Sequence, residues 1–235
     1  ILNVESAREL HAIQSIGQKI GLKPKIAIRI NPNFELKGSS MKMGGGPKQF
    51  GIDAEKVPSI LKELNPQHFD FEGFHIFSGS QNLRADSIAD AQEKALALAY
   101  ELAPYAPTNI KSINIGGGFG IPYFPGDLHL DTEFIGKKLY ERIPEVKKRL
   151  PLAKIVIELG RFLVGESGVY TCRVIEKKIS REQTYLIVDG GLHHHLAASG
   201  NFGQIIRKNY PVAVGNRMNC EQKEIVSVVG PLCTP

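Results

Sequence analysis

The sequence contains no tryptophan, only three cysteines and no apolar run long enough to cross a lipid bilayer. The cysteines, Cys172, Cys220 and Cys233, are odd in number and widely spaced. Such a set provides no disulfide framework, so we expect a protein of the reducing cytoplasm. An initiating methionine is missing too, and the chain opens inside the apolar stretch ILNV. We therefore expect an internal piece of a longer protein, in which the lack of a targeting signal carries little information.

A clustered stripe of basic charge is also lacking. The formal net charge is +5, with 29 basic and 24 acidic residues, and the two signs are dispersed along the chain. A nucleic-acid groove usually needs basic residues gathered on one face, so the composition argues against a nucleic-acid partner. The positive balance would suit a small anionic ligand. With 235 residues and 42% hydrophobic residues, the chain can bury one large core or two modest ones.

Strand-like and helix-like segments alternate over the first 160 residues. The apolar periods predict five strands and four helices between them. The predicted strands are ILNV (1–4), KIAIRI (25–30), the run through FDFEGF (69–74) into HIFSGSQ (75–81), IKSINI (110–115) and KIVIEL (154–159), and the predicted helices cover 5–20, 54–64, 87–102 and 133–150. Alternation of this kind is typical of a parallel sheet with helical crossovers, which places the chain in the α/β class.

The pattern changes after this region, because no long helix follows. Four strand-like segments with short polar connections remain: GVYTCRVIEKKI (168–179), TYLIVDGG (184–191), PVAV (211–214) and EIVSVVG (224–230). We therefore predict a β/α domain over residues 1–162 and part of an all-β domain over 163–235.

Unusual polar and glycine residues gather where predicted strands end. Asn31, SGSQ (78–81), GGGFG (116–120) and ELGR (158–161) follow four of the five strands. The carboxyl ends of parallel strands meet at one edge, where β/α barrels build active sites and open sheets bind ligands. The sequence thus predicts a ligand site at this edge.

Each candidate also has a plain structural interpretation. Gly116, Gly117 and Gly118 can cradle a phosphate with backbone N–H groups, or simply form a tight turn. Glu158 ends an apolar strand and needs a partner, which can be Arg161 or a protonated ligand nitrogen.

The other candidates are equally open at this point. Ser78, Ser80 and Gln81 can bind an anion or cap the following helix, whereas His75 and Phe77 are most simply core residues. The run His193–His195 lacks the spacing of a metal site, so no metal is expected. Cys233 is either inert core or an exposed, reactive thiol.

Taken in order, the motifs NVES, RINPN, FGI, GSQ, GGGFGIPY, ELGR, DGG and GPLC resemble the diaminopimelate/ornithine decarboxylase family. These are pyridoxal-phosphate enzymes of the alanine-racemase-like fold. The resemblance runs across the whole chain. It implies a partial TIM-type β/α barrel, covering about strands 4–8, followed by the start of an all-β domain. It also implies a homodimer with shared active sites.

The resemblance assigns roles by position. Ser80, Gly116, Gly117 and Gly118, foremost Gly118, look like the phosphate cradle of pyridoxal phosphate, with Gly160 and Arg161 as its next part. Glu158 looks like the carboxylate that holds the pyridine nitrogen protonated. The remaining assignments are Arg29 as a supporting arginine, Phe77 at the position that stacks on the cofactor ring, and Cys233 as the acid that enters the partner subunit's site and protonates the substrate carbon.

The sequence departs from the family pattern in three places. The lysine that binds the cofactor covalently lies on the family's first barrel strand, and ILNV corresponds to about the fourth. We therefore expect this chain alone to be inactive. Phe77 stands where the family usually has histidine. Thr234 and Pro235 follow Cys233, where glutamate commonly helps to bind the far amino group of diaminopimelate.

Three functional hypotheses follow. The first is a pyridoxal-phosphate-dependent amino-acid decarboxylase acting on a free or carrier-protein-bound amino acid, without nucleic-acid or membrane partners. The second is a decarboxylase-like protein that has lost activity and binds a partner, which Phe77 and the CTP ending motivate. The third is an amino-acid racemase, which Glu158 disfavours because racemases of this fold typically place arginine against the pyridine nitrogen.

Overall fold

The computed structural model describes residues 1–38, 41–195 and 209–233. The chain forms two compact units. The first combines residues 1–121 with 128–163, and the second combines 122–127 with the described part of 164–235. The sequence predicted a domain boundary after residue 162, next to the point where these two units divide. That the two units are separate domains stays a prediction. No helix in the described ranges has the length and apolar character needed to span a membrane.

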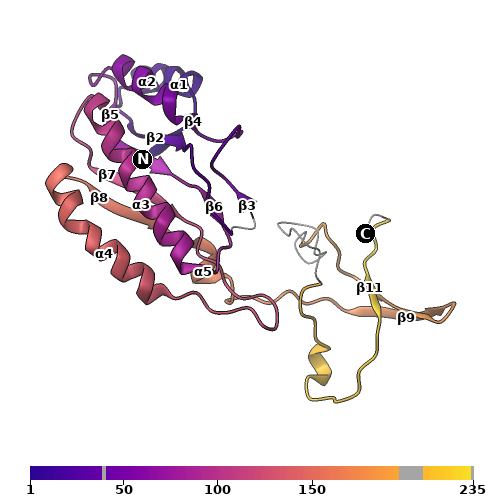
Figure 1. The fold of residues 1–235 in the computed structure, drawn as a ribbon. Helices are drawn as coiled ribbons and strands as arrows, with labels where there is room; N and C mark the ends of the chain where they lie inside the picture. Colours follow the sequence, from indigo (N-terminus) through magenta and orange to yellow (C-terminus); the bar gives the residue numbers. More distant parts are fainter. Residues whose placement is uncertain (39–40, 196–208, 234–235) are drawn as a thin grey trace. The chain divides into compact units, whose positions relative to one another are not determined.

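A parallel sheet forms the centre of the first unit (Figure 1). Each main strand pairs in parallel with the next one along the chain, so the order never reverses. The strands, in spatial order, are β1 (Leu2–Val4), β2 (Lys25–Asn31), β5 (Asp70–Ile76), β7 (Ser112–Gly117) and β8 (Lys154–Glu158), and β4 (Ile52–Asp53) pairs with the end of β2. A singly wound order is that of a β/α barrel, whereas doubly wound sheets reverse direction.

Helices connect these strands, and local sequence signals set their ends. Ser6 accepts a hydrogen bond from the backbone of Glu9 at the start of α1, and Gly21 ends that helix in the left-handed conformation. Asp131 caps α4 in the same way as Ser6 caps α1. The helices are α1 (Ala7–Ile20), η1 (Ala54–Lys56), α2 (Val57–Glu63), α3 (Ala85–Leu102), η2 (Ala103–Tyr105), α4 (Thr132–Arg149) and α5 (Gly160–Val164).

The main core lies between one face of the sheet and the helices. Alternate residues of β2, Ile26, Ile28 and Ile30, pack there with apolar residues of the neighbouring strands and of α1 to α4. The intervening residues point to the opposite face. There Arg29 pairs in register with His75, and His75 with Asn114. The sheet thus has an apolar helix-facing side and a polar row on the side that faces the interior of a barrel.

All five predicted strands and all four predicted helices of this region are present, with shifted ends. The predicted helix at 54–64 begins as a 3-10 turn, and Pro58 lies in the first turn of α2, where its missing N–H is tolerated. Three two-residue strands were not predicted, and β4 is one of them. β3 (Met41–Lys42) and β6 (Gly79–Ser80) pair antiparallel, so the glycine-rich loop after β2 contacts the segment after β5.

The second unit contains a separate small sheet. Its strands are β9 (Val174–Ser180), β10 (Gln183–Val188) and β11 (Ser227–Val229), in the order β11-β10-β9. A 3-10 turn, η4, covers Gly215–Arg217. The prediction of a strand at PVAV is wrong: residues 211–214 are exposed and unpaired to any strand of the described chain. Pro211 cannot donate a ladder hydrogen bond, which disfavours pairing there.

Candidate functional site

The loops that follow β5, β7 and β8 are tied together by hydrogen bonds. The backbone N–H of Asn82 donates to the Gly118 carbonyl, at 2.9 Å, and Gly120 donates to the Asn82 carbonyl at the same distance. The Gln81 amide donates to the Ile121 carbonyl (2.6 Å) and accepts from the Ile121 N–H (3.2 Å). Its oxygen also accepts from Arg161 (3.2 Å). Three of the predicted strand-end segments therefore meet, as expected for parallel strands.

The glycine triplet after β7 is closely surrounded by backbone. Gly116 and Gly118 have φ of 71° and 81°, the left-handed conformation used by anion-binding nests. A Cβ at Gly117 would lie 1.7 Å from the Glu158 carbonyl oxygen, and one at Gly118 would lie 2.4 Å from the Gly79 oxygen. No other residue fits these positions, so the loop presents bare backbone at the strand ends.

Glu158 at the end of β8 is held by two side chains. Its Oε1 accepts a hydrogen bond from Asn114 Nδ2 at 2.8 Å, and its Oε2 lies 3.3 Å from His75 Nε2. Its side chain is 45% exposed. Arg161, one of the two partners considered from the sequence, is not among the recorded partners of Glu158 in the described residues. The carboxylate is thus anchored and still accessible to a ligand.

His75 is a buried residue of β5 that faces this carboxylate. Burial lowers the pKa of its imidazole, and the opposing charge of Glu158 only partly offsets that effect. The ring is therefore neutral near pH 7, with Nε2–H positioned to donate to Glu158. Its Nδ1 atom is buried without a partner in the described structure. The sequence favoured core packing for His75, which accounts for its burial but not for its contact with Glu158.

Arg29 of β2 lies in the same row as His75. It donates to Glu5 Oε1 at 2.8 Å, and its guanidinium lies 5.0 Å from the centre of the Phe50 ring. The other oxygen of Glu5 accepts from the backbone of Gly51 at 2.9 Å. Glu5, which was not predicted, thereby fixes Arg29 and closes the β1 end of the site.

Ser80 and Phe77 lie in the segment that follows β5. Ser80 belongs to β6, whereas α3 begins at Ala85 with Arg84 as its N-cap and no side-chain cap. The alternative that a serine caps this helix is therefore wrong, because the segment turns into a strand pair first. Phe77 is half-buried, and its ring edge would be 3.0 Å from a Cβ at Gly116, so it packs against the glycine loop.

The structure also describes three further predicted residues. Asn31 donates to the Gly46 carbonyl and to Asp53, and its own side-chain oxygen is buried without a partner in the described residues. Gly160 is exposed at the start of α5, with open space around it. Cys233 is exposed in the second unit, and its role stays a prediction.

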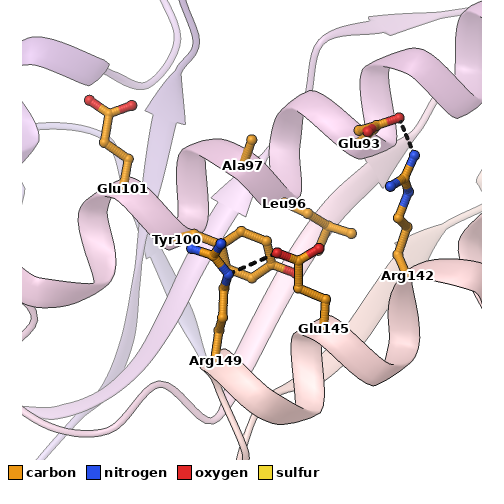
Figure 2. A pocket seen from close by; sticks show the side chains of 8 residues that line it. All are labelled: Glu93, Leu96, Ala97, Tyr100, Glu101, Arg142, Glu145 and Arg149. Carbon is orange, nitrogen blue, oxygen red and sulfur yellow. Dashed lines mark hydrogen bonds and ion pairs between the residues drawn. The ribbon is translucent and has the colours of Figure 1, made fainter.

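A groove on the outer layer does not belong to this site. It lies between α3 and α4, and both of its arginines are paired with glutamates (Figure 2). Arg142 contacts Glu93 at 2.7 Å, and Arg149 contacts Glu145 at 2.9 Å and covers the Tyr100 ring. Both arginines of the groove are thus already paired, and the strand ends remain the candidate site.

A singly wound β/α sheet with a glycine nest, a held carboxylate and an arginine at its carboxyl edge defines a cofactor-binding barrel segment. The chain belongs to the family of pyridoxal-dependent decarboxylases: residues 1–165 match the model of its pyridoxal binding domain. This membership confirms the resemblance inferred from the motifs and the expectation of pyridoxal phosphate as the cofactor.

Two curated relatives show the range of the family. The chain is 36% identical over 236 residues to an L-glutamyl-[BtrI acyl-carrier protein] decarboxylase of Niallia circulans, covering 98% of this chain and 55% of the relative. It is 32% identical to the diaminopimelate decarboxylase of Aquifex aeolicus, covering 99% of this chain and 53% of the relative. The chain therefore spans about half the length of these proteins.

Solved structures confirm the fold. Diaminopimelate decarboxylase from Helicobacter pylori, complexed with L-lysine, matches 99% of this chain and 55% of its own, with 26% identity and a TM-score of 0.77. AQ1208 from Aquifex aeolicus matches 98% of this chain and 51% of its own, with 29% identity and a TM-score of 0.74. The prediction of a partial TIM-type barrel followed by a β region is thus confirmed.

The described residues fit pyridoxal phosphate. The nest at Gly116–Gly118, closed to any Cβ, suits the phosphate. Glu158 has acceptor capacity left after binding Asn114 and His75, because a carboxylate offers about four lone-pair positions. A protonated ring nitrogen can use one of them, and Phe77 provides an apolar ring beside the loop.

Proposed function

We propose that the full-length protein is a pyridoxal-phosphate-dependent amino-acid decarboxylase. The observation that carries this proposal is the placement of Glu158. Its carboxylate is accessible, held by two side chains and located at the same sheet edge as the glycine nest. Family membership supports the same chemistry.

Each residue of the site has a distinct task in this proposal. Pyridoxal phosphate, when bound, supplies an electron sink for the pair of electrons left by the departing CO₂. Glu158 keeps the ring nitrogen protonated, and Phe77 contacts the ring. The residues assigned to the phosphate are Ser80, Gly116, Gly117, Gly118, Gly160 and Arg161.

Two more residues act around the substrate. Arg29, fixed by Glu5, supports the site from β2. Cys233 protonates the substrate carbon after CO₂ leaves, and we propose that it does so in the site of a partner subunit, as part of a homodimer. An exposed thiol suits this role, because it must reach a site other than its own.

We infer that the substrate is a carrier-protein-bound amino acid rather than free diaminopimelate. Thr234 stands where the family commonly uses glutamate to bind the far amino group of diaminopimelate. One curated relative, at 36% identity, is named for an acyl-carrier-protein-bound L-glutamyl substrate. Both observations point to a substrate without a free distal amine.

The direct test uses full-length protein supplied with pyridoxal phosphate. The absorbance of the bound cofactor and the release of CO₂ would be measured with a panel of amino acids, free and loaded on acyl-carrier proteins. Glu158→Gln should reduce turnover by about 100-fold or more, because a neutral amide cannot stabilise the charged ring nitrogen. Glu166→Gln, an exposed residue of the same region, serves as the matched control.

The possible results separate the hypotheses. Release of CO₂ from carrier-bound but not from free amino acids would support the proposed substrate. Cofactor binding without CO₂ release from any compound of the panel would favour the inactive, partner-binding relative. Absence of bound cofactor in the full-length protein would contradict the proposal outright.

A further inference from the structure

Asn114 makes contacts with two parts of the candidate site at once. Its Oδ1 accepts a hydrogen bond from the backbone N–H of Gly116 at 2.9 Å, and its Nδ2 donates to Glu158 Oε1 at 2.8 Å. One amide therefore connects the glycine nest to the carboxylate. In the proposed function, these are the groups that bind opposite ends of one cofactor.

The path of the chain around Asn114 explains how one side chain can bridge both parts. The register between β7 and β8 shifts between Asn114 and Gly117, so that Gly117 pairs with Glu158. This irregularity turns the chain at Gly116, whose φ is 71°. The turn brings the Gly116 N–H back to the Asn114 side chain, a local pairing that asparagine commonly forms.

His75 restrains the second oxygen of the same carboxylate. Its Nε2 lies 3.3 Å from Glu158 Oε2. On the sheet, His75 is in register with Asn114 of the neighbouring strand β7. Its ring is 6% exposed and Nδ1 has no partner in the described structure. Loss of the Nε2 contact would leave neither ring nitrogen with a partner among the described residues, and a buried unpaired nitrogen is costly.

We propose that Asn114 and His75 are positioning residues, which together fix the orientation of the Glu158 carboxylate relative to the glycine nest. Neither residue needs to contact substrate in this role. Two donors from two strands remove the rotational freedom of the carboxylate and leave its other lone pairs for the ring nitrogen. This inference rests on the proposed function.

The decisive variant is Asn114→Asp in the full-length protein. Aspartate keeps the acceptor for the Gly116 N–H, but it loses the donor to Glu158 and places a like charge beside it. The loop contact is therefore kept in this variant, and a loss of kcat comes from the change beside Glu158. We expect a loss of kcat of about 10- to 100-fold with cofactor still bound, because a hydrogen bond to a charged group is lost. Asn109→Asp, on the exposed loop before β7, is the matched control.

A spectroscopic measurement distinguishes positioning from general damage. The protein is loaded with pyridoxal phosphate labelled with ¹⁵N in the ring, and the ¹⁵N shift is recorded across pH. The charge added in Asn114→Asp would by itself move the loss of the ring proton to a higher pH. A loss of that proton at a lower pH than in wild type would therefore report that the Glu158 carboxylate is no longer held toward the ring. For His75, the alanine variant should lose kcat, and His75→Gln, which retains an amide donor, should recover part of it.

Two outcomes would overturn the inference. The first is an Asn114→Asp variant with wild-type kcat and an unchanged ¹⁵N profile. The second is equal loss of kcat in His75→Ala and His75→Gln. Wild-type protein that gives no bound-cofactor signal would instead contradict the proposed function, so failure of the two ideas can be told apart.

Discussion

Single polar residues inside apolar strands determine the chemistry of this site. Arg29, His75 and Asn114 each stand between buried apolar neighbours, and the in-register pairing of β2, β5 and β7 aligns them in one row. A polar group in such a position needs a partner, because burial without one is costly. Glu5 and Glu158 supply those partners from the ends of β1 and β8.

The row could be predicted from the sequence only in part. Glu158 could be identified because a carboxylate directly after the apolar run KIVI is unusual. The glycines could be identified because three glycines in succession are also unusual. Asn114 was missed, although it alternates with Ile113 and Ile115 two residues before the glycine triplet. A single asparagine in a strand has many explanations. The role of Asn114 becomes clear only from its partner Glu158, which lies 44 residues further along the chain and is brought to it by the fold.

The buried His75 should make stability depend on pH. Its pKa lies below the ordinary value of 6.5 because of desolvation, aided by Arg29 and opposed by Glu158 and Glu5. The unfolded chain therefore binds more protons than the folded one in the window below 6.5, and the free energy of unfolding rises with pH there. Below the folded-state pKa both forms are protonated and the slope vanishes.

Urea denaturation of the full-length protein without cofactor, at several values from about pH 7 to about pH 5, measures this effect. Stability should fall as pH falls, and His75→Gln should remove that part of the slope. His11→Gln, on the exposed face of α1, should retain it. Identical slopes in wild type and His75→Gln would show that His75 keeps the same pKa on folding.

At the scale of elements, strands and helices with a full period were predictable and tertiary pairings were not. The long strands and helices repeat their apolar positions over several residues. The two-residue strands β3, β4 and β6 are too short to show a period, and they exist only because β3 pairs with β6 and β4 pairs with β2. β7 ends at Gly117, whereas the predicted strand ends at residue 115. The register between β7 and β8 shifts after Asn114, and Gly117 still pairs with Glu158, so the strand continues into glycines that resemble a loop in the sequence.

Two glycine-to-alanine substitutions should therefore have opposite effects. At Gly117 the new Cβ would lie 1.7 Å from the Glu158 carbonyl oxygen, so β7 and β8 must separate. We expect a loss of several kcal/mol, since strand pairing and the adjacent core are both disturbed. At Gly136, exposed within α4, nothing lies within 4 Å of the new Cβ. There alanine should stabilise by about 0.5–1 kcal/mol.

Thermal unfolding of the full-length variants, followed by circular dichroism, compares the two directly. The contrast controls for the chemistry of the change, because both variants add one methyl group. A Gly117→Ala protein as stable as wild type would mean that the β7–β8 contact at Glu158 is looser than the structure shows. Destabilisation by Gly136→Ala would contradict the exposed, helical setting of that residue.

At the scale of the whole molecule, the residues that we propose for the site come from both compact units. Glu158 and the glycine nest belong to the first unit, and Cys233 belongs to the second. The chain spans about half the length of its curated relatives. The sequence predicted two domains with a change near residue 162, and that assignment stays a prediction. It could not show which copy of the protein completes a given site.

Mixing two inactive variants would answer that question. In a dimer with shared sites, each site combines Glu158 from one subunit with Cys233 from the other. A heterodimer of Glu158→Gln and Cys233→Ala subunits then contains one site with both changes and one site with neither. With random exchange of subunits, half of the dimers are mixed, so activity should return to about a quarter of the wild-type value.

The two full-length variants would be unfolded together, refolded together and assayed for CO₂ release, with each variant treated alone as the control. Recovery requires subunit exchange and a shared site, because no single chain in the mixture carries both residues. If Cys233 acted in the site of its own subunit, every site would lack either Glu158 or Cys233 and the mixture would stay inactive. Light scattering of the refolded mixture would confirm that dimers had formed, so an inactive dimer would count against shared sites.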